Sequence, residues 1–144
     1  MESTAHKLGL QLQVLRASDE REFDEVFENV SKLGAAGLVI NPGAFFASHA
    51  EQLATQALRH SVPAIFWRRQ FVAAGGLAGY GGNTEESYRL AGIYAGRILK
   101  GQRPADLPVQ QLTKIELFIN LKTAKALGIT VPQTLLVAAD EVIQ

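Results

Sequence analysis

The side chains best suited to contact a ligand follow the ends of short apolar segments. Aromatic rings can cover an apolar or π-electron group, an arginine can fork onto a carboxylate, and a tyrosine hydroxyl or asparagine amide can orient a bound molecule. This combination is typical of binding a small molecule without transforming it. The alternatives are a solvated loop anchored by Trp67 and a core position for at least one of Phe45 and Phe46. The candidate ligand-binding residues are Phe45, Phe46, Trp67, Arg69, Tyr80 and Asn83, with Arg68 beside them.

No motif for catalysis accompanies these residues. Ser48 and His49 are adjacent in sequence, which does not place them as nucleophile and base, and the sequence has no G-x-S-x-G motif. The acidic pairs at 24–25 and 140–141 fall on predicted helices, where carboxylates usually form a solvated face. An enzyme is therefore the least favoured interpretation, and no catalytic residue is predicted.

Metal and phosphate sites are not predicted either. The chain has no cysteine, and its three histidines, His6, His49 and His60, fall in separate predicted elements. The glycines between 75 and 82 lack the G-x-G-x-x-G spacing between a strand and a helix, so they favour turns and close packing. We expect no cofactor.

The elements that position the candidate residues alternate between strands and helices. Residues 8–15 alternate apolar and polar side chains, which predicts an edge strand, and the apolar run 37–41 predicts a central one. A capping box at Asp19 and Glu22 opens a predicted helix that ends at Gly34. Further predicted elements are a helix over 48–60 and a strand over 62–66. This order predicts right-handed parallel crossovers and a three-layer, Rossmann-like α/β fold with a mostly parallel sheet. Ligands bind such sheets at the carboxyl ends of the strands.

The second half of the chain predicts two more strands and three helices. Residues 71–74 read as a link, and the strands are expected at 77–81 and 115–119. A second capping box at 83–86 opens a helix over 84–100, whose face of small residues predicts a close neighbour. The prolines in 101–113 predict an extended crossing. Asn120 is expected to cap a short helix, and a last helix is predicted from Pro132 to about Ile143.

Composition restricts the partners. The chain has 144 residues, 47% of them hydrophobic, which suits a single domain with its own core. Fourteen basic residues balance fourteen acidic ones, so no broad field favours nucleic acid. No apolar run reaches the roughly 20 residues that span a bilayer, and the first ten residues lack the pattern of a signal peptide. Neither nucleic acid nor direct membrane insertion is expected.

Two stretches carry a resemblance to a known family. They are AGGLAGYGGN at 74–83 and GRILKGQRPADLPVQQLTKIELFINLKTAKALGITVPQTLL at 96–136. Over essentially all of its length the chain resembles the carboxyl-terminal part of ABC-transporter substrate-binding proteins of the tryptophan/tyrosine type. The resemblance implies a type I periplasmic binding protein, in which two Rossmann-like lobes close on a small solute and deliver it to an ABC permease. It also implies a periplasmic location and no enzymatic activity.

The chain departs from this family in length and in local motifs. Family members are about twice as long and begin with an export signal, so the chain resembles the second lobe of such a protein. On this basis residues 1–82 would be the lobe core, 83–113 a helix and crossing toward the first lobe, and 114–144 a return strand with terminal helices. The family's acidic-Pro-Phe-Phe turn appears here as Gly43-Ala44-Phe45-Phe46, and its Arg-Glu-Phe as Arg69-Gln70-Phe71. Both changes remove a carboxylate.

The resemblance and the residue pattern together predict a truncated lobe that binds an amino-acid-like solute, and the family resemblance implies that the solute is aromatic. Trp67, Arg69, Tyr80 and Asn83 would then lie on the cleft wall, with the two phenylalanines flanking it. The helix without a neighbour predicts a homo-oligomer formed by exchange of elements between copies. The alternative is a binding or regulatory module on the same fold without a role in transport.

Overall fold

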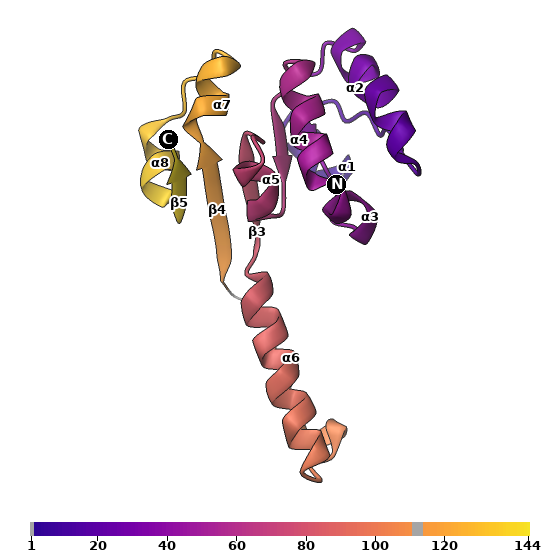
Figure 1. Ribbon diagram of the computed structural model, residues 1–144, viewed down its shortest axis with the longest axis vertical. Coiled ribbons are helices and arrows are strands. Elements are labelled where there is room, and N and C mark those ends of the chain that lie inside the picture. Colours follow the sequence, from indigo (N-terminus) through magenta and orange to yellow (C-terminus); the bar gives the residue numbers. More distant parts are fainter. Residues whose placement is uncertain (1, 111–113) are drawn as a thin grey trace.

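The computed structural model describes residues 2–110 and 114–144, and within them the chain forms one five-stranded sheet (Figure 1). Its strands lie in chain order, and every neighbouring pair is parallel except β3 and β4. The strands are β1 (Leu38–Val39), β2 (Ala64–Phe66), β3 (Ala78–Gly82), β4 (Ile115–Asn120) and β5 (Glu141–Ile143). Helices flank this sheet, so the predicted α/β class with a mostly parallel sheet is confirmed.

The helices are short, with one exception. They are α1 (Glu2–Lys7), α2 (Phe23–Lys32), α3 (Ala44–Ser48), α4 (Ala50–Arg59), α5 (Arg69–Ala73), α6 (Thr84–Leu99), α7 (Leu121–Ala126) and α8 (Gln133–Ala138), with single 3-10 turns η1 (Glu20–Glu22) and η2 (Pro104–Asp106). Among the helices of the described ranges, none has the length and apolarity needed to cross a membrane.

The 3-10 turn η1, which leads directly into α2, is capped by its local sequence. The carboxylate of Asp19 accepts a hydrogen bond from the Arg21 amide at 2.9 Å, and the carboxylate of Glu22 accepts from the Ser18 and Asp19 amides at 2.7 and 3.3 Å. These backbone hydrogen bonds, the one from Ser18 first, lower the pKa of Glu22. The capping box predicted at Asp19 and Glu22 is therefore confirmed.

The hydrophobic core lies where α2, α4 and α5 cover one face of the sheet. Its largest fully buried side chains are Phe23, Phe27, Phe66, Phe71 and Val72. Burying a large apolar side chain contributes about 1.5–3 kcal/mol, so these five side chains account for a large part of the stability of the lobe.

Asn120 joins the end of β4 to α5 and α7. It is only 5% exposed; its side-chain oxygen accepts from the Thr123 amide at 3.0 Å, and its side-chain nitrogen donates to the Val72 carbonyl at 3.1 Å. The predicted cap is thus confirmed, and the same side chain also satisfies a carbonyl of another helix.

The opposite face of the sheet is only partly covered. Strand register and side-chain alternation place Val39, Tyr80 and Ile115 on this face, and they are 61%, 56% and 52% exposed. Several large exposed apolar side chains on one face of a sheet often mark a contact surface. We call these three residues the open face.

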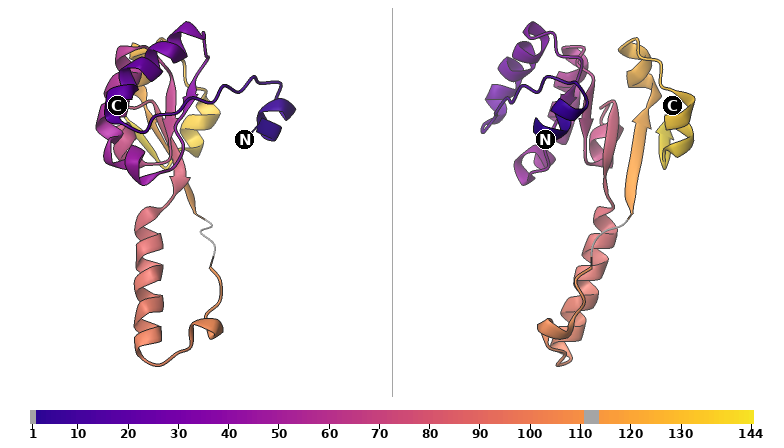
Figure 2. Two further views of the ribbon diagram at one scale, coloured as in Figure 1. Left: turned by 90° about the vertical axis from the view of Figure 1, so that its right-hand side faces the viewer. Right: turned by 180° about the vertical axis from the view of Figure 1, so that it is seen from behind.

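Two strand predictions in the first half are wrong. Residues 10–17 have no regular structure, and Leu10 and Val14 are 62% and 64% exposed. No strand of the described residues pairs with this segment, so its alternating pattern does not become a strand. The preceding residues form α1, which stands apart from the rest of the lobe in Figure 2. The run 37–41, predicted as a central strand, contributes only β1 at the sheet edge, where its only ladder partner in the described chain is β2.

Two further predictions are corrected in helical segments. The link predicted at 71–74 belongs to α5, which buries Phe71 and Val72 completely. The final helix was expected to reach Ile143, but it ends at Ala138 and the chain turns into β5. The Asp140 amide donates to the Leu117 carbonyl at 2.9 Å, and the Asp140 carboxylate accepts from the Leu117 amide at the same distance. Pairing with β4 therefore overrides the local helical pattern.

Helix α6 forms an arm that projects from the body of the lobe (Figure 1). None of its residues is buried, and Tyr88 and Leu99 are 72% and 87% exposed. The segment after α6 runs back beside it, and the Tyr94 hydroxyl donates to the Pro108 carbonyl. The predicted helix is confirmed. The segment predicted as an extended crossing contains the 3-10 turn η2, and its residues 111–113 lie outside the described residues.

Candidate functional site

Trp67 and Arg68 form a stacked pair directly after β2. The Arg68 guanidinium carbon lies 4.2 Å from the centroid of the Trp67 ring, which is cation–π distance. The Trp67 ring meets Phe66 edge-on, with 6.0 Å between centroids, and packs against the core. The indole Nε1 of Trp67 and the Nε of Arg68 are both buried, and neither has a hydrogen-bond partner among the described residues.

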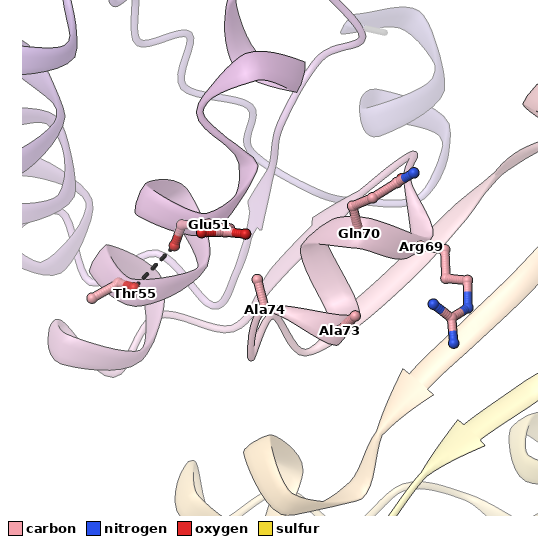
Figure 3. A pocket seen from close by; sticks show the side chains of 6 residues that line it. All are labelled: Glu51, Thr55, Arg69, Gln70, Ala73 and Ala74. Atoms are coloured by element: carbon pink, nitrogen blue, oxygen red, sulfur yellow. Dashed lines mark hydrogen bonds between the residues drawn. The ribbon is translucent and has the colours of Figure 1, made fainter.

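Arg69, one residue further on, binds a carboxylate of its own chain. Its Nε and Nη2 donate to the two carboxylate oxygens of Glu141, each at 2.6 Å. These hydrogen bonds to the charged forms raise the pKa of Arg69 and lower the pKa of Glu141. Figure 3 shows the Arg69 side chain directed toward the strands and away from Ala74. The fork predicted for a solute carboxylate is therefore occupied by Glu141.

This pairing predicts a pH-dependent effect of Glu141→Gln. Because the folded state lowers the pKa of Glu141, the pair contributes stability above the unfolded value of about 4.3, and that stability is lost as pH falls through the lower folded value. Both side chains are partly exposed, so solvent screening limits the expected loss at pH 7 to about 0.5 kcal/mol. Urea unfolding at about pH 7 and about pH 3 measures it. The difference from the unsubstituted chain should shrink at the lower pH; an equal difference at both would contradict it. Exposed Glu25→Gln is the matched control.

Asn83 uses its amide within the chain. Its side-chain oxygen accepts from the Glu86 amide at 2.8 Å and so caps α6, and its side-chain nitrogen donates to Glu116 at 2.9 Å. Glu116 also accepts from the Lys114 ammonium at 2.8 Å, and these hydrogen bonds, the one from Lys114 first, lower its pKa. The Glu86 carboxylate pairs with Arg89, so only half of the predicted second capping box forms.

Tyr80 belongs to the open face. A Cβ atom built on its neighbour Gly81 would lie 2.3 Å from the Trp67 carbonyl oxygen, so Gly81 faces the chain at Trp67 while Tyr80 points to the other side of the sheet. The structure therefore brings Trp67 and Arg69 to one end of the sheet but does not place the Tyr80 ring beside them.

Phe45 and Phe46 lie on α3 and pack together. Their ring centroids are 5.3 Å apart, and Phe45 also lies 5.6 Å from Phe23 and 4.8 Å from the His49 ring. Both are half-buried and pack against the core without belonging to its fully buried cluster. Within the described chain no aromatic contact joins this group to Trp67.

Ser48, His49 and Glu20 come close together without forming a nucleophile and base. The Ser48 hydroxyl lies 3.1 Å from His49 Nδ1, and His49 Nε2 lies 3.1 Å from the Glu20 carboxylate. However, the Phe45 carbonyl lies 2.8 Å from both the Ser48 hydroxyl and His49 Nδ1. A carbonyl only accepts, so Nδ1 carries a proton there and does not serve as a base for Ser48.

A shallow pocket lies between α4 and α5 and has a volume of about 390 Å³ (Figure 3). Its lining residues are Glu51, Thr55, Arg69, Gln70, Ala73 and Ala74. Only Arg69 was a predicted site residue. Ala73 and Ala74 were missed because residues 71–74 were predicted as a link, and Glu51 and Thr55 because they were assigned only to a helix, with no sign that α5 packs beside it. The described residues contain no group of three or more metal-ligating side chains.

The family of this chain follows from its sequence match. Residues 1–143 match the family described as ABC transporter substrate binding protein. The chain belongs to this family. The resemblance inferred from the two sequence stretches is thereby confirmed. Members bind solutes, and substrate-binding proteins of ABC transporters typically work in the periplasm or outside the cell. No curated protein matches the chain.

Three solved structures share the fold. A conserved domain protein from Vibrio cholerae is 23% identical with a TM-score of 0.88, and covers 98% of this chain and 47% of its own. The ABC domain from Streptococcus pneumoniae in complex with L-Trp is 25% identical with a TM-score of 0.85, covering 99% and 49%. A ligand-free, open substrate binding protein from Clostridium difficile is 22% identical with a TM-score of 0.65, covering 99% and 48%. The chain thus spans about half the length of these relatives.

Proposed function

We propose that this chain supplies one lobe of the solute-binding component of an ABC importer, and that the solute is an aromatic amino acid or a close analogue. The observation that carries the proposal is the Trp67–Arg68 pair at the carboxyl end of β2, the edge where ligands bind parallel sheets. The relative from Streptococcus pneumoniae, 25% identical, was solved in complex with L-Trp. Binding, and not catalysis, is the proposed role.

The proposed cleft wall consists of residues near this end of the sheet and its loops. Its proposed solute-contacting members are Phe45, Phe46, Trp67, Arg68 and Asn83. Of the other predicted residues, Arg69 is held by Glu141 and would support the wall without contacting the solute, and Tyr80 lies on the open face, away from Trp67. In this proposal a second lobe closes over the wall and traps the solute, because the closed state makes more contacts with it. No residue of α6 is buried against the body of the lobe. In this proposal the α6 arm and the segment that follows it form the crossing toward the second lobe. The partners would be a small solute and an ABC permease, with the protein on the periplasmic side.

A thermal-shift series tests the solute class. Ligand that binds only the folded state at ten times its Kd adds about 1.4 kcal/mol, which raises the Tm of a lobe of this size by about 5 °C. We expect L-tryptophan, L-tyrosine and L-phenylalanine to raise the Tm of the chain, and L-alanine and L-lysine to leave it unchanged. No shift with any aromatic amino acid at millimolar concentration would refute the proposal.

We also propose that copies of the chain associate in the absence of a second lobe. The open face and the α6 arm both expose apolar side chains that a second copy would cover. Light scattering at micromolar concentration should report about twice the 15.6 kDa of one chain. The substitution Tyr80→Lys, which puts a charge on the open face, should reduce the measured mass to the 15.6 kDa of a monomer. A stable monomer of the unsubstituted chain would contradict the proposal.

A further inference from the structure

We propose that Arg68, and not Arg69, receives the carboxylate of the solute, and that it does so by leaving the face of the Trp67 ring. This inference rests on the proposed solute-binding function and names the group that carries specificity within it. Its starting point is the set of hydrogen-bond donors at the end of β2 that have no acceptor in the lobe itself.

Arg69 has little to gain from a solute carboxylate. Its Nε and Nη2 already donate to both oxygens of Glu141 at 2.6 Å, in the bidentate geometry that gives the strongest arginine–carboxylate pairs. A solute would have to displace this internal carboxylate, and the exchange would leave Glu141 without its partner. The net change in hydrogen bonding would be close to zero.

Arg68 and Trp67 present the opposite situation. Within the described residues, three buried side-chain polar atoms lack a hydrogen-bond partner: the Oε1 of Gln56, the Nε1 of Trp67 and the Nε of Arg68. Two of these three atoms are donors on adjacent residues, and the guanidinium of one lies 4.2 Å over the ring of the other. A buried donor without a partner costs about 1–3 kcal/mol, so this pair of residues holds two donors whose free energy an acceptor would lower.

A carboxylate suits these two donors because it has two oxygens and a negative charge. One oxygen can accept from the indole N–H and the other from the guanidinium, in charge-assisted hydrogen bonds of about 1.5–3 kcal/mol each. Acetate-like groups alone would use only these donors. A solute that also carries a flat apolar group would gain the ring face as well.

Access requires Arg68 to move, since the donor atoms are buried. Leaving the Trp67 ring forfeits a cation–π contact of about 0.5–1 kcal/mol, which is less than the charge-assisted hydrogen bonds contribute. The same movement uncovers the indole face for the apolar part of the solute. The class of solute that Trp67 and Arg68 would bind is therefore a carboxylate joined to an aromatic or other flat apolar group.

NMR of the chain labelled with nitrogen-15 tests this directly. Trp67 is the single tryptophan, so its indole N–H gives one resonance that needs no further assignment. The probes are L-phenylalanine and L-phenylalaninamide, which share a ring and an ammonium group but differ in the carboxylate. We expect the indole proton to move downfield with L-phenylalanine, as for a new hydrogen bond to an acceptor, and to show no such shift with the amide.

Two methionine substitutions separate the arginines. Arg68→Met keeps an apolar stem over the indole and removes the donors, and Arg69→Met is the matched control. Arg68→Met should weaken L-phenylalanine binding about tenfold, the loss expected for one hydrogen bond to a charged group, while Arg69→Met should weaken it less than about threefold. If Arg68→Met fails to give a dispersed spectrum, Arg68→Leu, which also removes every donor of the side chain, replaces it with the same expectation.

The outcomes distinguish this inference from the proposed function. If backbone resonances shift with L-phenylalanine but the indole proton does not, or if Arg69→Met causes the larger loss of affinity, the role assigned to Arg68 is overturned while solute binding stands. If no resonance shifts with any aromatic amino acid, both the role of Arg68 and the proposed solute class are wrong.

Discussion

Replacing Phe71 with alanine should remove about 3–5 kcal/mol from the free energy of unfolding, because it leaves a cavity at the centre of the core. Phe71 is 0% exposed and its ring meets that of Phe66 edge-on, with centroids 5.5 Å apart. A Cβ atom built on Gly76 would lie only 2.1 Å from the Phe71 ring, so the ring also rests directly on the glycine backbone. Small domains are stable by about 5–15 kcal/mol, so this loss is a large fraction of the stability of the lobe.

Urea unfolding followed by circular dichroism measures the effect of this substitution. Leu99→Ala removes a large side chain that is 87% exposed on α6 and is the control, with an expected change below about 0.5 kcal/mol. If Phe71→Ala is too unstable to study, Phe71→Leu should show a smaller loss at the same site. Equal effects of Phe71→Ala and Leu99→Ala would show that the core does not centre on α5.

Adding one methyl group at Gly81 should destabilise the lobe by about 1–3 kcal/mol, because there is no room for it. The new Cβ atom would lie 2.3 Å from the carbonyl oxygen of Trp67 and 3.1 Å from its carbonyl carbon. Backbone atoms do not rotate away as a side-chain tip does, so β3 and the chain after β2 must separate. The Trp67–Arg68 pair lies at this point, and we expect its packing to loosen too.

The same substitution at Gly92 provides the matched control for Gly81→Ala. Gly92 lies within α6 and a Cβ atom there meets no atom within 4 Å. Alanine forms helix better than glycine by about 1 kcal/mol, so Gly92→Ala should be neutral or stabilising. Fluorescence of the single tryptophan gives a second measurement: Gly81→Ala should shift its emission toward longer wavelength, and Gly92→Ala should not. An unchanged emission and unchanged stability for Gly81→Ala would contradict the close approach.

The position of Arg69 shows why a site is harder to predict than an element. Its type and its place after an apolar strand predicted a guanidinium that forks onto a solute carboxylate, and in the structure the guanidinium forks onto a carboxylate of its own chain. The carboxylate belongs to Glu141, which lies 72 residues later in the chain. Glu141 is on β5, a strand that the sequence pattern predicted as helix. A local pattern contains the donor geometry of a side chain but not the identity of a distant acceptor.

The sequence alone determined the elements whose causes are local. The capping hydrogen bonds of Asp19 and Asn120 join groups two or three residues apart. The apolar runs around β2 and β4 are long enough to predict buried strands and hence the mostly parallel α/β class. Only the tertiary structure decided which segments pair. Residues 10–17 lack a ladder partner and form no strand, whereas residues 141–143 find one in β4 and do, because a strand's hydrogen bonds are made to another strand and are absent from its own sequence.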